Sequence, residues 1–256
     1  MEDFPFESSS FPVLGLDDTT DKIKGVGTCT LTRLDDERLF LINSAHTLDI
    51  WGDNSPIFIA LPNGKTIELP FALKTKSKSV DKVDVAVTPL LGSFASHFND
   101  AAISSLPLYN DINSEDFNQY AKRVVFFGYP SSASRFSIDL KRNEIKAKPL
   151  CLTTTEENNL TKKTIETYDI DLSIHIIASF ERRKMKEKNG NIKTSPRPQG
   201  ISGGAVFFVY VEVGEGIDII KGGEFAGIGN EYLENRSIIK ATKKSAISSF
   251  IRKNFI

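Results

Sequence analysis

Short apolar runs separated by turn residues recur along most of the chain, and this pattern constrains the fold more than any other feature. Residues 27–33 alternate in polarity, residues 34–38 make a polar turn, and residues 39–42 resume the apolar pattern, which predicts a hairpin. A second hairpin is predicted around the Pro-Asn-Gly turn at residues 62–64. Further strands are expected at residues 83–87, 124–127, 174–179, 206–213, 217–220 and 224–228. Because helical crossovers are missing between these runs, we expect antiparallel sheets.

Only two segments have a helical pattern. Residues 114–120 form a short and weak one. Residues 243–255 space Ile247, Phe250 and Ile251 so that they share one helix face. The sequence therefore predicts an all-β architecture that ends in a C-terminal helix.

Composition excludes several classes of protein. The 32 basic and 33 acidic residues nearly cancel, so no charge excess points to nucleic acid or to a membrane surface as partner. The sequence has no run of about 18 apolar residues, so no membrane span is predicted. Residues 1–5 lack the basic start and apolar run of a signal peptide. Cys29 and Cys151 lie far apart, so we expect both to be reduced and largely buried and the protein to be cytoplasmic. No phosphate loop, metal-ligand spacing or dinucleotide fingerprint is present, so no cofactor or metal is expected.

Residues 181–197 differ from the rest of the chain. They are strongly basic and almost devoid of apolar side chains, which predicts a solvated loop or a long hairpin tip. The segment runs directly into a glycine-rich motif that contains Ser202.

Ser202 lies in the sequence Gly-Ile-Ser-Gly-Gly-Ala that starts at Gly200. Glycines around a serine let backbone N–H groups converge on one point, as acyl transfer requires when a carbonyl oxygen becomes an anion. A plain glycine-rich turn between strands is the simpler alternative. The motif also fits the nucleophile elbow of α/β-hydrolases, but that fold needs its histidine after the serine, and no histidine follows Ser202.

The three histidines differ in their sequence surroundings. His46 follows an apolar strand among small residues, at a strand-to-loop junction where catalytic side chains are common. His97 lies in a polar stretch that predicts an exposed loop. His175 lies inside an apolar strand, where a histidine with satisfied hydrogen bonds is expected. His46 is therefore the candidate base.

Asp84 lies within the apolar run Val-Asp-Val-Ala-Val. Burying a carboxylate is costly unless donors or a cation compensate, which favours a role in orienting an imidazole. A structural role in capping a nearby loop is the alternative. Asp81, beside Lys82, is explained as a surface residue.

Three motifs in order, Asn-Ser-Ala-His, Val-Asp-Val-Ala-Val and Gly-Ile-Ser-Gly-Gly-Ala, resemble those of the chymotrypsin-like serine peptidases. Those peptidases usually carry T-A-A-H, D-[IV]-A-[LV] and G-[DN]-S-G-G-P. The likeness extends to residues 27–30, 227–229 and 239–242, and it covers the chain from about Gly25 to Phe255. It implies two six-stranded β-barrels, at about residues 20–110 and 120–242, followed by a helix at about residues 243–255.

The resemblance also implies a role for each matching residue. Ser202 would attack a carbonyl carbon, His46 would relay the proton, and Asp84 would hold His46. The N–H groups of Gly200 and Ser202 would bind the oxyanion. Asn230, Glu231 and Tyr232 would pair with the backbone of a peptide substrate as an added strand.

Departures from the family pattern refine the expectation. Ile201 replaces the aspartate that pairs with a newly cut N-terminus in secreted relatives, Thr47 replaces a half-cystine, and Ala205 replaces a proline. The chain therefore resembles intracellular, HtrA-like members without zymogen activation. The loop that holds the floor of the specificity pocket is the divergent basic segment, so no preferred cleavage residue is predicted.

These observations predict an intracellular serine endopeptidase that acts on a protein or peptide substrate. Residues 184–197 are expected to become ordered only with a substrate or an activating protein partner. A catalytically silent scaffold with the same fold and an esterase for small acyl substrates are the alternatives.

Overall fold

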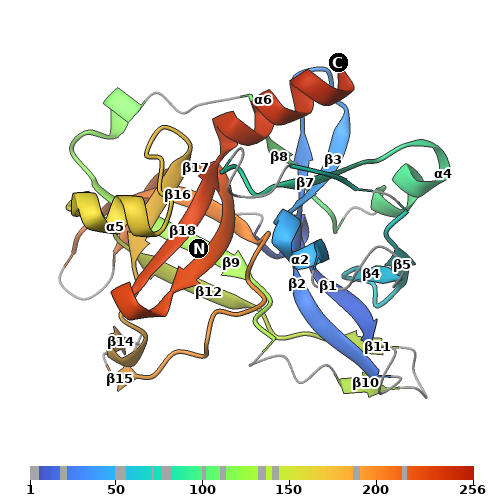
Figure 1. The fold of residues 1–256 in the computed structure, drawn as a ribbon, viewed down its shortest axis with the longest axis horizontal. Helices are drawn as coiled ribbons and strands as arrows, with labels where there is room; N and C mark the ends of the chain where they lie inside the picture. Colours follow the sequence, from blue (N-terminus) through green and yellow to red (C-terminus); the bar gives the residue numbers. More distant parts are fainter. Residues whose placement is uncertain are drawn as a thin grey trace.

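The structure is a computed structural model that describes residues 6–17, 22–49, 56–70, 72–75, 82–99, 102–109, 114–131, 137–139, 144–186, 191–214 and 218–256. Two curled sheets make up most of the molecule, one on each side in Figure 1. Several positions used in the sequence predictions lie outside the described residues, namely residues 1–5, Asp81, residues 187–190 and residue 217.

The N-terminal sheet is antiparallel apart from one short parallel pair, β2 with β8. Its strand order is β5-β4-β1-β2-β3-β7-β6. The strands are β1 (Ser10–Asp17), β2 (Lys22–Arg33), β3 (Leu39–Asn43), β4 (Ile57–Ala60), β5 (Thr66–Glu68), β6 (Leu73–Lys74), β7 (Ala86–Pro89) and β8 (Leu106–Pro107). The helical segments described in this half are α1 (Phe6–Ser9), α2 (Ala45–Asp49), α4 (Gly92–Ala95) and η1 (Ser96–Phe98).

The C-terminal sheet has six strands in the order β12-β9-β16-β17-β18-β13, all antiparallel. They are β9 (Ala121–Gly128), β12 (Leu150–Thr154), β13 (His175–Ser179), β16 (Ala205–Glu212), β17 (Ile219–Leu233) and β18 (Ile238–Lys243). Among the described residues, two small ribbons are separate from both large sheets: β10 (Ser137–Asp139) with β11 (Glu144–Lys146), and β14 (Met185–Lys186) with β15 (Ile192–Lys193). The helical segments are η2 (Ser114–Phe117), α5 (Lys162–Thr167), η3 (Arg182–Lys184), η4 (Glu234–Arg236) and α6 (Lys244–Phe255).

One apolar core joins the two sheets and α6. It contains Phe40 and Val87 from the N-terminal sheet, Phe127 from the C-terminal sheet, and Ile247 and Ile251 from α6, all buried. Burial of aromatic and branched side chains of this size stabilises each by about 1.5–3 kcal/mol relative to exposure. The shared core therefore fixes the position of one sheet relative to the other.

Helix α6 also contacts the N-terminal sheet directly, and it lies at the edge of the molecule in Figure 1. The rings of Phe255 and Phe40 meet edge-on with centroids 5.6 Å apart. Arg252 donates to Asp35 at 2.8 Å, and Arg38 donates to the Phe255 carbonyl at 2.9 Å.

The architecture predicted from the sequence is confirmed in outline, with two curled and mainly antiparallel sheets followed by a C-terminal helix. Both predicted hairpins exist, since Leu31 pairs with Leu41 and Ile59 pairs with Ile67. The N-terminal sheet holds eight strands rather than six and begins at Ser10, ahead of the predicted boundary near residue 20.

Three local predictions are corrected, and one helix was not predicted. Helical structure near residues 114–120 is a single turn, Ser114–Phe117, and the unpredicted α5 is present. The strand predicted at residues 83–87 begins only at Ala86, because Asp84 has a left-handed backbone with φ 51°. Cys29 is buried, but Cys151 is exposed, because alternation along β12 turns Leu152 inward and its neighbour outward. Within the described residues no helix is long and apolar enough to cross a membrane.

Candidate active site

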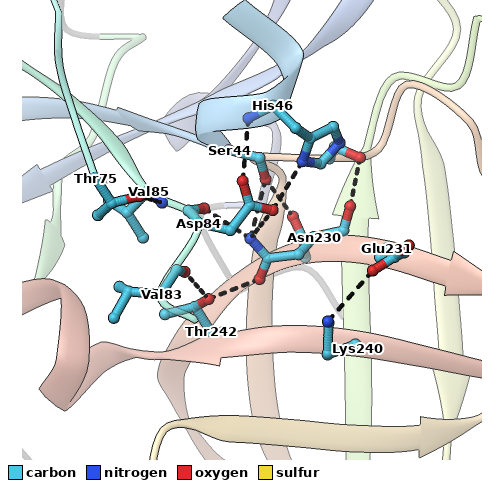
Figure 2. A network of polar contacts seen from close by, with 12 residues as sticks. Ser44, His46, Thr75, Val83, Asp84, Val85, Asn230, Glu231, Lys240 and Thr242 are labelled. Atoms are coloured by element: carbon cyan, nitrogen blue, oxygen red, sulfur yellow. Dashed lines mark hydrogen bonds and ion pairs between the residues drawn. The ribbon is translucent and has the colours of Figure 1, made fainter. Parts of the chain in front are cut away.

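His46 and Asp84 form a two-point contact. Asp84 Oδ2 lies 2.7 Å from Nδ1 of His46, and Asp84 Oδ1 accepts the backbone N–H of His46 at 3.0 Å (Figure 2). Since a carboxylate only accepts, Nδ1 carries the ring proton and Nε2 is left as the acceptor. The Asp84 side chain is 5% exposed and that of His46 is 33% exposed, so the pair is sheltered at the carboxylate and open at the imidazole.

Local sequence explains how the two residues reach each other. His46 lies in the short helix α2, which begins at Ala45 and is separated from the end of β3 at Asn43 only by Ser44. Asp84 lies two residues before β7, which pairs with β3. Neighbouring strands therefore deliver both side chains to the same edge of the N-terminal sheet.

A third side chain, that of Asn230, completes the polar cluster. Its Nδ2 lies 2.9 Å from the Asp84 carbonyl oxygen, 3.2 Å from Asp84 Oδ2 and 3.2 Å from Ser44 Oγ (Figure 2). Asn230 falls at a register shift between Gly229 and Glu231 in β17, and bulges of this kind re-aim a side chain. The residue is 2% exposed, so its amide serves the carboxylate inside the protein.

The loop that carries Ser202 depends on its glycines. Gly200 and Gly203 have φ of 96° and 84°, a region that disfavours residues with a Cβ. A Cβ on Gly203 would collide with the Thr28 carbonyl. The Thr28 N–H donates to the Ser202 carbonyl at 2.9 Å, so β2 of the N-terminal sheet holds this loop in place.

The Ser202 hydroxyl donates to the Asn230 carbonyl at 2.7 Å and makes no hydrogen bond to His46. The predicted serine therefore lies beside the His46–Asp84 pair with its proton directed elsewhere. Within the described part of the chain, the N–H groups of Gly200 and Ser202 donate to no backbone carbonyl, while that of Ile201 bonds to Pro198. The role of these two N–H groups as oxyanion donors stays a prediction.

A pocket of about 190 Å³ brings the predicted residues together. Its lining includes His46, Gln199, Ser202, Asn230, Glu231 and Tyr232. All three predicted catalytic residues contribute to one polar region, with Asp84 behind His46, and the three predicted substrate-binding residues border the same pocket.

Charge at this pocket comes from Glu231, whose carboxylate lies 3.3 Å from the Lys240 ammonium. Lys240 is 5% exposed, and its Nζ also donates to the Tyr168 carbonyl at 3.3 Å. Tyr232 packs against Phe180, and burial raises the pKa of its phenol. The pocket therefore presents apolar surface beside a carboxylate that a buried cation partly neutralises.

Two features of the site escaped the sequence analysis. Pairing of Asn230 with a substrate backbone stays a prediction, and no role was predicted for its side chain, which binds Asp84. Thr242 was given no role, yet its hydroxyl lies 2.8 Å from Oδ1 of Asn230. A signal was present, because Asn230 directly follows the apolar run at residues 225–229 of β17, and a polar side chain buried there needs hydrogen-bond partners as Asp84 does.

No group of three His, Cys, Asp or Glu side chains suited to a metal ion occurs among the residues that the structure describes. His97 lies in η1 and is exposed, and its ring packs against Phe94.

Comparisons with known proteins add little beyond the fold. A scan against models of protein families and a search of curated proteins both find no match. Solved structures do match, among them one described as "Structure of Glu endopeptidase in complex with MPD". It is 12% identical, the alignment covers 97% of this chain and 90% of that chain, and the TM-score is 0.48. A likeness at this level carries no conclusion about activity.

Proposed function

We propose that the chain is a serine endopeptidase that cleaves peptide bonds through Ser202, His46 and Asp84. The observation that carries the proposal is the two-point contact of Asp84 with His46, which fixes the imidazole and leaves Nε2 facing the pocket that Ser202 borders. Buried carboxylates that hold an imidazole in one tautomer are the orienting part of acyl-transfer sites.

In the proposed reaction, Ser202 Oγ attacks the carbonyl carbon while His46 Nε2 takes the hydroxyl proton. Asp84 stabilises the resulting imidazolium, and the oxyanion receives hydrogen bonds from the N–H groups of Gly200 and Ser202. His46 then gives the proton to the leaving amine, which frees one peptide product. Water hydrolyses the acyl-enzyme by the same steps in reverse order.

Before attack, the Ser202 hydroxyl has to leave the Asn230 carbonyl and turn to His46. We propose that an extended substrate brings this about, because a backbone N–H of a peptide added along residues 230–232 is a donor for the same carbonyl. Binding of substrate and orientation of the nucleophile would then be coupled through Asn230.

The proposal includes an activating protein partner that acts on residues 184–197. Part of this segment is the β14–β15 ribbon, and the Ser195 N–H donates to the Arg182 carbonyl at 2.9 Å. The residues of this loop that the structure describes are mostly exposed and precede the serine motif, so a partner bound to them would lie next to Gly200 in sequence. Full casein hydrolysis by the isolated chain would refute this gating.

The proposal also places the protein in the cytoplasm, a reducing compartment. It is supported by Cys29 and Cys151, which form no disulfide.

A fluorophosphonate probe tests the central proposal, since it phosphonylates an activated serine without needing a peptide subsite. We expect mass spectrometry to locate the label on Ser202. His46→Ala should abolish labelling, and Asp84→Asn should slow it by roughly 10⁴-fold. His97→Ala is the matched control and should label as the parent does, because His97 is exposed and outside the site.

The Ser202–Asn230 bond also favours a second candidate, a catalytically silent scaffold that keeps the fold. Absence of labelling at Ser202 in a folded chain would support this scaffold over the enzyme. An esterase uses the same chemistry, so a peptide library assayed against Ser202→Ala separates peptide hydrolysis from ester hydrolysis.

A further inference from the structure

Three consecutive carbonyl groups in the loop that carries Asp84 are each bonded by a side chain of the C-terminal sheet. The Lys82 carbonyl lies 3.0 Å from His175 Nε2. The Val83 carbonyl accepts from Thr242 Oγ1 at 2.7 Å, and the Asp84 carbonyl accepts from Asn230 Nδ2 at 2.9 Å (Figure 2). The donors come from β13, β18 and β17, so one sheet holds the backbone that positions a carboxylate of the other.

His175 and Thr242 are opposite each other in the β13–β18 ladder, which places their side chains on the same face. Both are buried, at 3% and 0% exposure. Their pairing explains why two adjacent carbonyls find donors at matching spacing.

Hydrogen bonding defines the tautomer of His175. Its Nδ1 accepts the backbone N–H of Asp171 at 2.9 Å, so Nε2 carries the proton and donates to the Lys82 carbonyl. Burial lowers the pKa of His175, and nearby Lys240 acts in the same direction, while the Lys82 carbonyl, Asp171 and Asp169 oppose them. The neutral form is the one that satisfies both partners.

The loop has a backbone that requires external support. Lys82 and Asp84 have φ of 59° and 51°, left-handed values that are costly for residues other than glycine and persist only where surrounding contacts impose them. The ladder with β3 begins only at Ala86. Side-chain donors from the C-terminal sheet therefore take the place of strand pairing just before β7.

We propose that His175 and Thr242 are positioning residues for Asp84, which hold the Lys82 and Val83 carbonyls so that the carboxylate meets His46 at two points. The inference rests on the proposed function, because it assigns these side chains to the geometry of that site. Neither side chain lines the pocket that holds Ser202. His175 would act through the Lys82 carbonyl, and Thr242 would act through the Val83 carbonyl and through Asn230 Oδ1, which lies 2.8 Å from its hydroxyl.

Two matched pairs of variants test the proposal. His175→Gln keeps a donor near the Nε2 position, whereas His175→Asn keeps only the acceptor near Nδ1. Thr242→Ser keeps the hydroxyl, whereas Thr242→Val keeps the shape without it. We expect the Asn and Val variants to lose roughly 10- to 100-fold in kcat with little change in KM, because misplacement by about 1 Å has an effect of this size. The Gln and Ser variants should stay within a few-fold of the parent.

A second readout is independent of hydrolysis. The proton that His46 Nδ1 shares with Asp84 Oδ2 should give a strongly deshielded NMR signal, and we expect it to move upfield or vanish in the Asn and Val variants only. If the parent shows this signal but no hydrolysis, the proposed function fails while the positioning role is still tested.

The proposal is overturned if folded His175→Asn and Thr242→Val keep the parent kcat and the deshielded signal. It is also overturned if these variants change KM rather than kcat. The same holds if His175→Gln and Thr242→Ser lose as much kcat as His175→Asn and Thr242→Val. Thr242→Val retains the packing volume, so it decides the matter should His175→Asn fail to fold.

Discussion

Replacing Asn230 by aspartate puts a second carboxylate beside that of Asp84 with almost no change in shape. Nδ2 of Asn230 lies 3.2 Å from Asp84 Oδ2, and Asn230 is 2% exposed. Two unit charges at that separation repel by about 5 kcal/mol at an effective dielectric constant of about 20. The pair can avoid this repulsion by holding one proton.

The cost of holding that proton depends on pH. An ordinary aspartate titrates near pH 3.9, so keeping one protonated at pH 7 costs about 4 kcal/mol, at about 1.4 kcal/mol per unit. Keeping both carboxylates charged and keeping one of them protonated are therefore similar in cost. Asn230→Asp should lower the free energy of unfolding by about 4–5 kcal/mol at pH 7. The folded state would bind a proton that the unfolded state lacks, so stability should fall as pH rises from about 4 to 7.

Urea unfolding between pH 5 and 7 measures this slope. The experiment belongs in a His46→Ala background, because the imidazole contacts Asp84 and would otherwise supply the proton itself. Adding Asp84→Asn to Asn230→Asp restores one carboxylate and one amide, and it should remove the slope. Asn230→Ala removes the donors without adding charge, and it should cost roughly 2–4 kcal/mol with little dependence on pH.

A slope below about 0.5 kcal/mol per pH unit for Asn230→Asp would refute the reasoning, because it would mean that the two side chains do not share a dry environment. The same conclusion would follow if the added Asp84→Asn left the slope unchanged.

Three further predictions concern the serine loop, the thiols and His175. Gly203→Ala should lower the free energy of unfolding, measured in urea, by about 3 kcal/mol or more, because φ is 84° and the added Cβ meets the Thr28 carbonyl. In the control Gly92→Ala the added Cβ has open space around it, so only the left-handed backbone strain of about 1–2 kcal/mol should be lost. Iodoacetamide should label exposed Cys151 in the native protein and Cys29 only after unfolding, since burial raises the pKa of the Cys29 thiol; equal rates by mass spectrometry would contradict this. Burial lowers the pKa of His175, so the stability that its neutral form confers should be fully present above about pH 6.5 and should decrease as the pH falls below that value. In urea unfolding, the midpoint concentration should therefore decrease less at acid pH for His175→Gln than for the parent.

Much of the fold could be predicted because strand periodicity is a local property. The pairs Leu31–Leu41 and Ile59–Ile67 follow from alternation on both sides of a polar turn. Strand β1 escaped detection, because a proline at position 12 interrupts the apolar residues of a strand that the structure nevertheless pairs with β2.

The candidate site could be predicted where a single residue would be costly to bury without hydrogen-bond partners. Asp84 stands out as a carboxylate in an apolar run, and the structure supplies it with the donors that such a residue needs. The direction of the Ser202 hydroxyl could not be predicted, since it is a single torsion whose preferred value depends on the Asn230 carbonyl of a distant strand. The proposed role of His175 could not be predicted for a similar reason. The sequence shows a histidine within a strand, but it does not show that its hydrogen-bond partner is the Lys82 carbonyl.

The polar cluster combines a rigid part with a movable one. Asp84 is held by the Asn230 side chain and by the backbone N–H and imidazole of His46, so displacing it means breaking several wholly or partly buried hydrogen bonds at about 1–3 kcal/mol each. The Ser202 hydroxyl exchanges one neutral hydrogen bond for another, a change of about 1 kcal/mol or less. In the proposed reaction the imidazole and carboxylate are therefore set before substrate arrives, and only the nucleophile has to turn. The Asn230 residue links the two parts, because its amide supports the carboxylate while its carbonyl holds the serine.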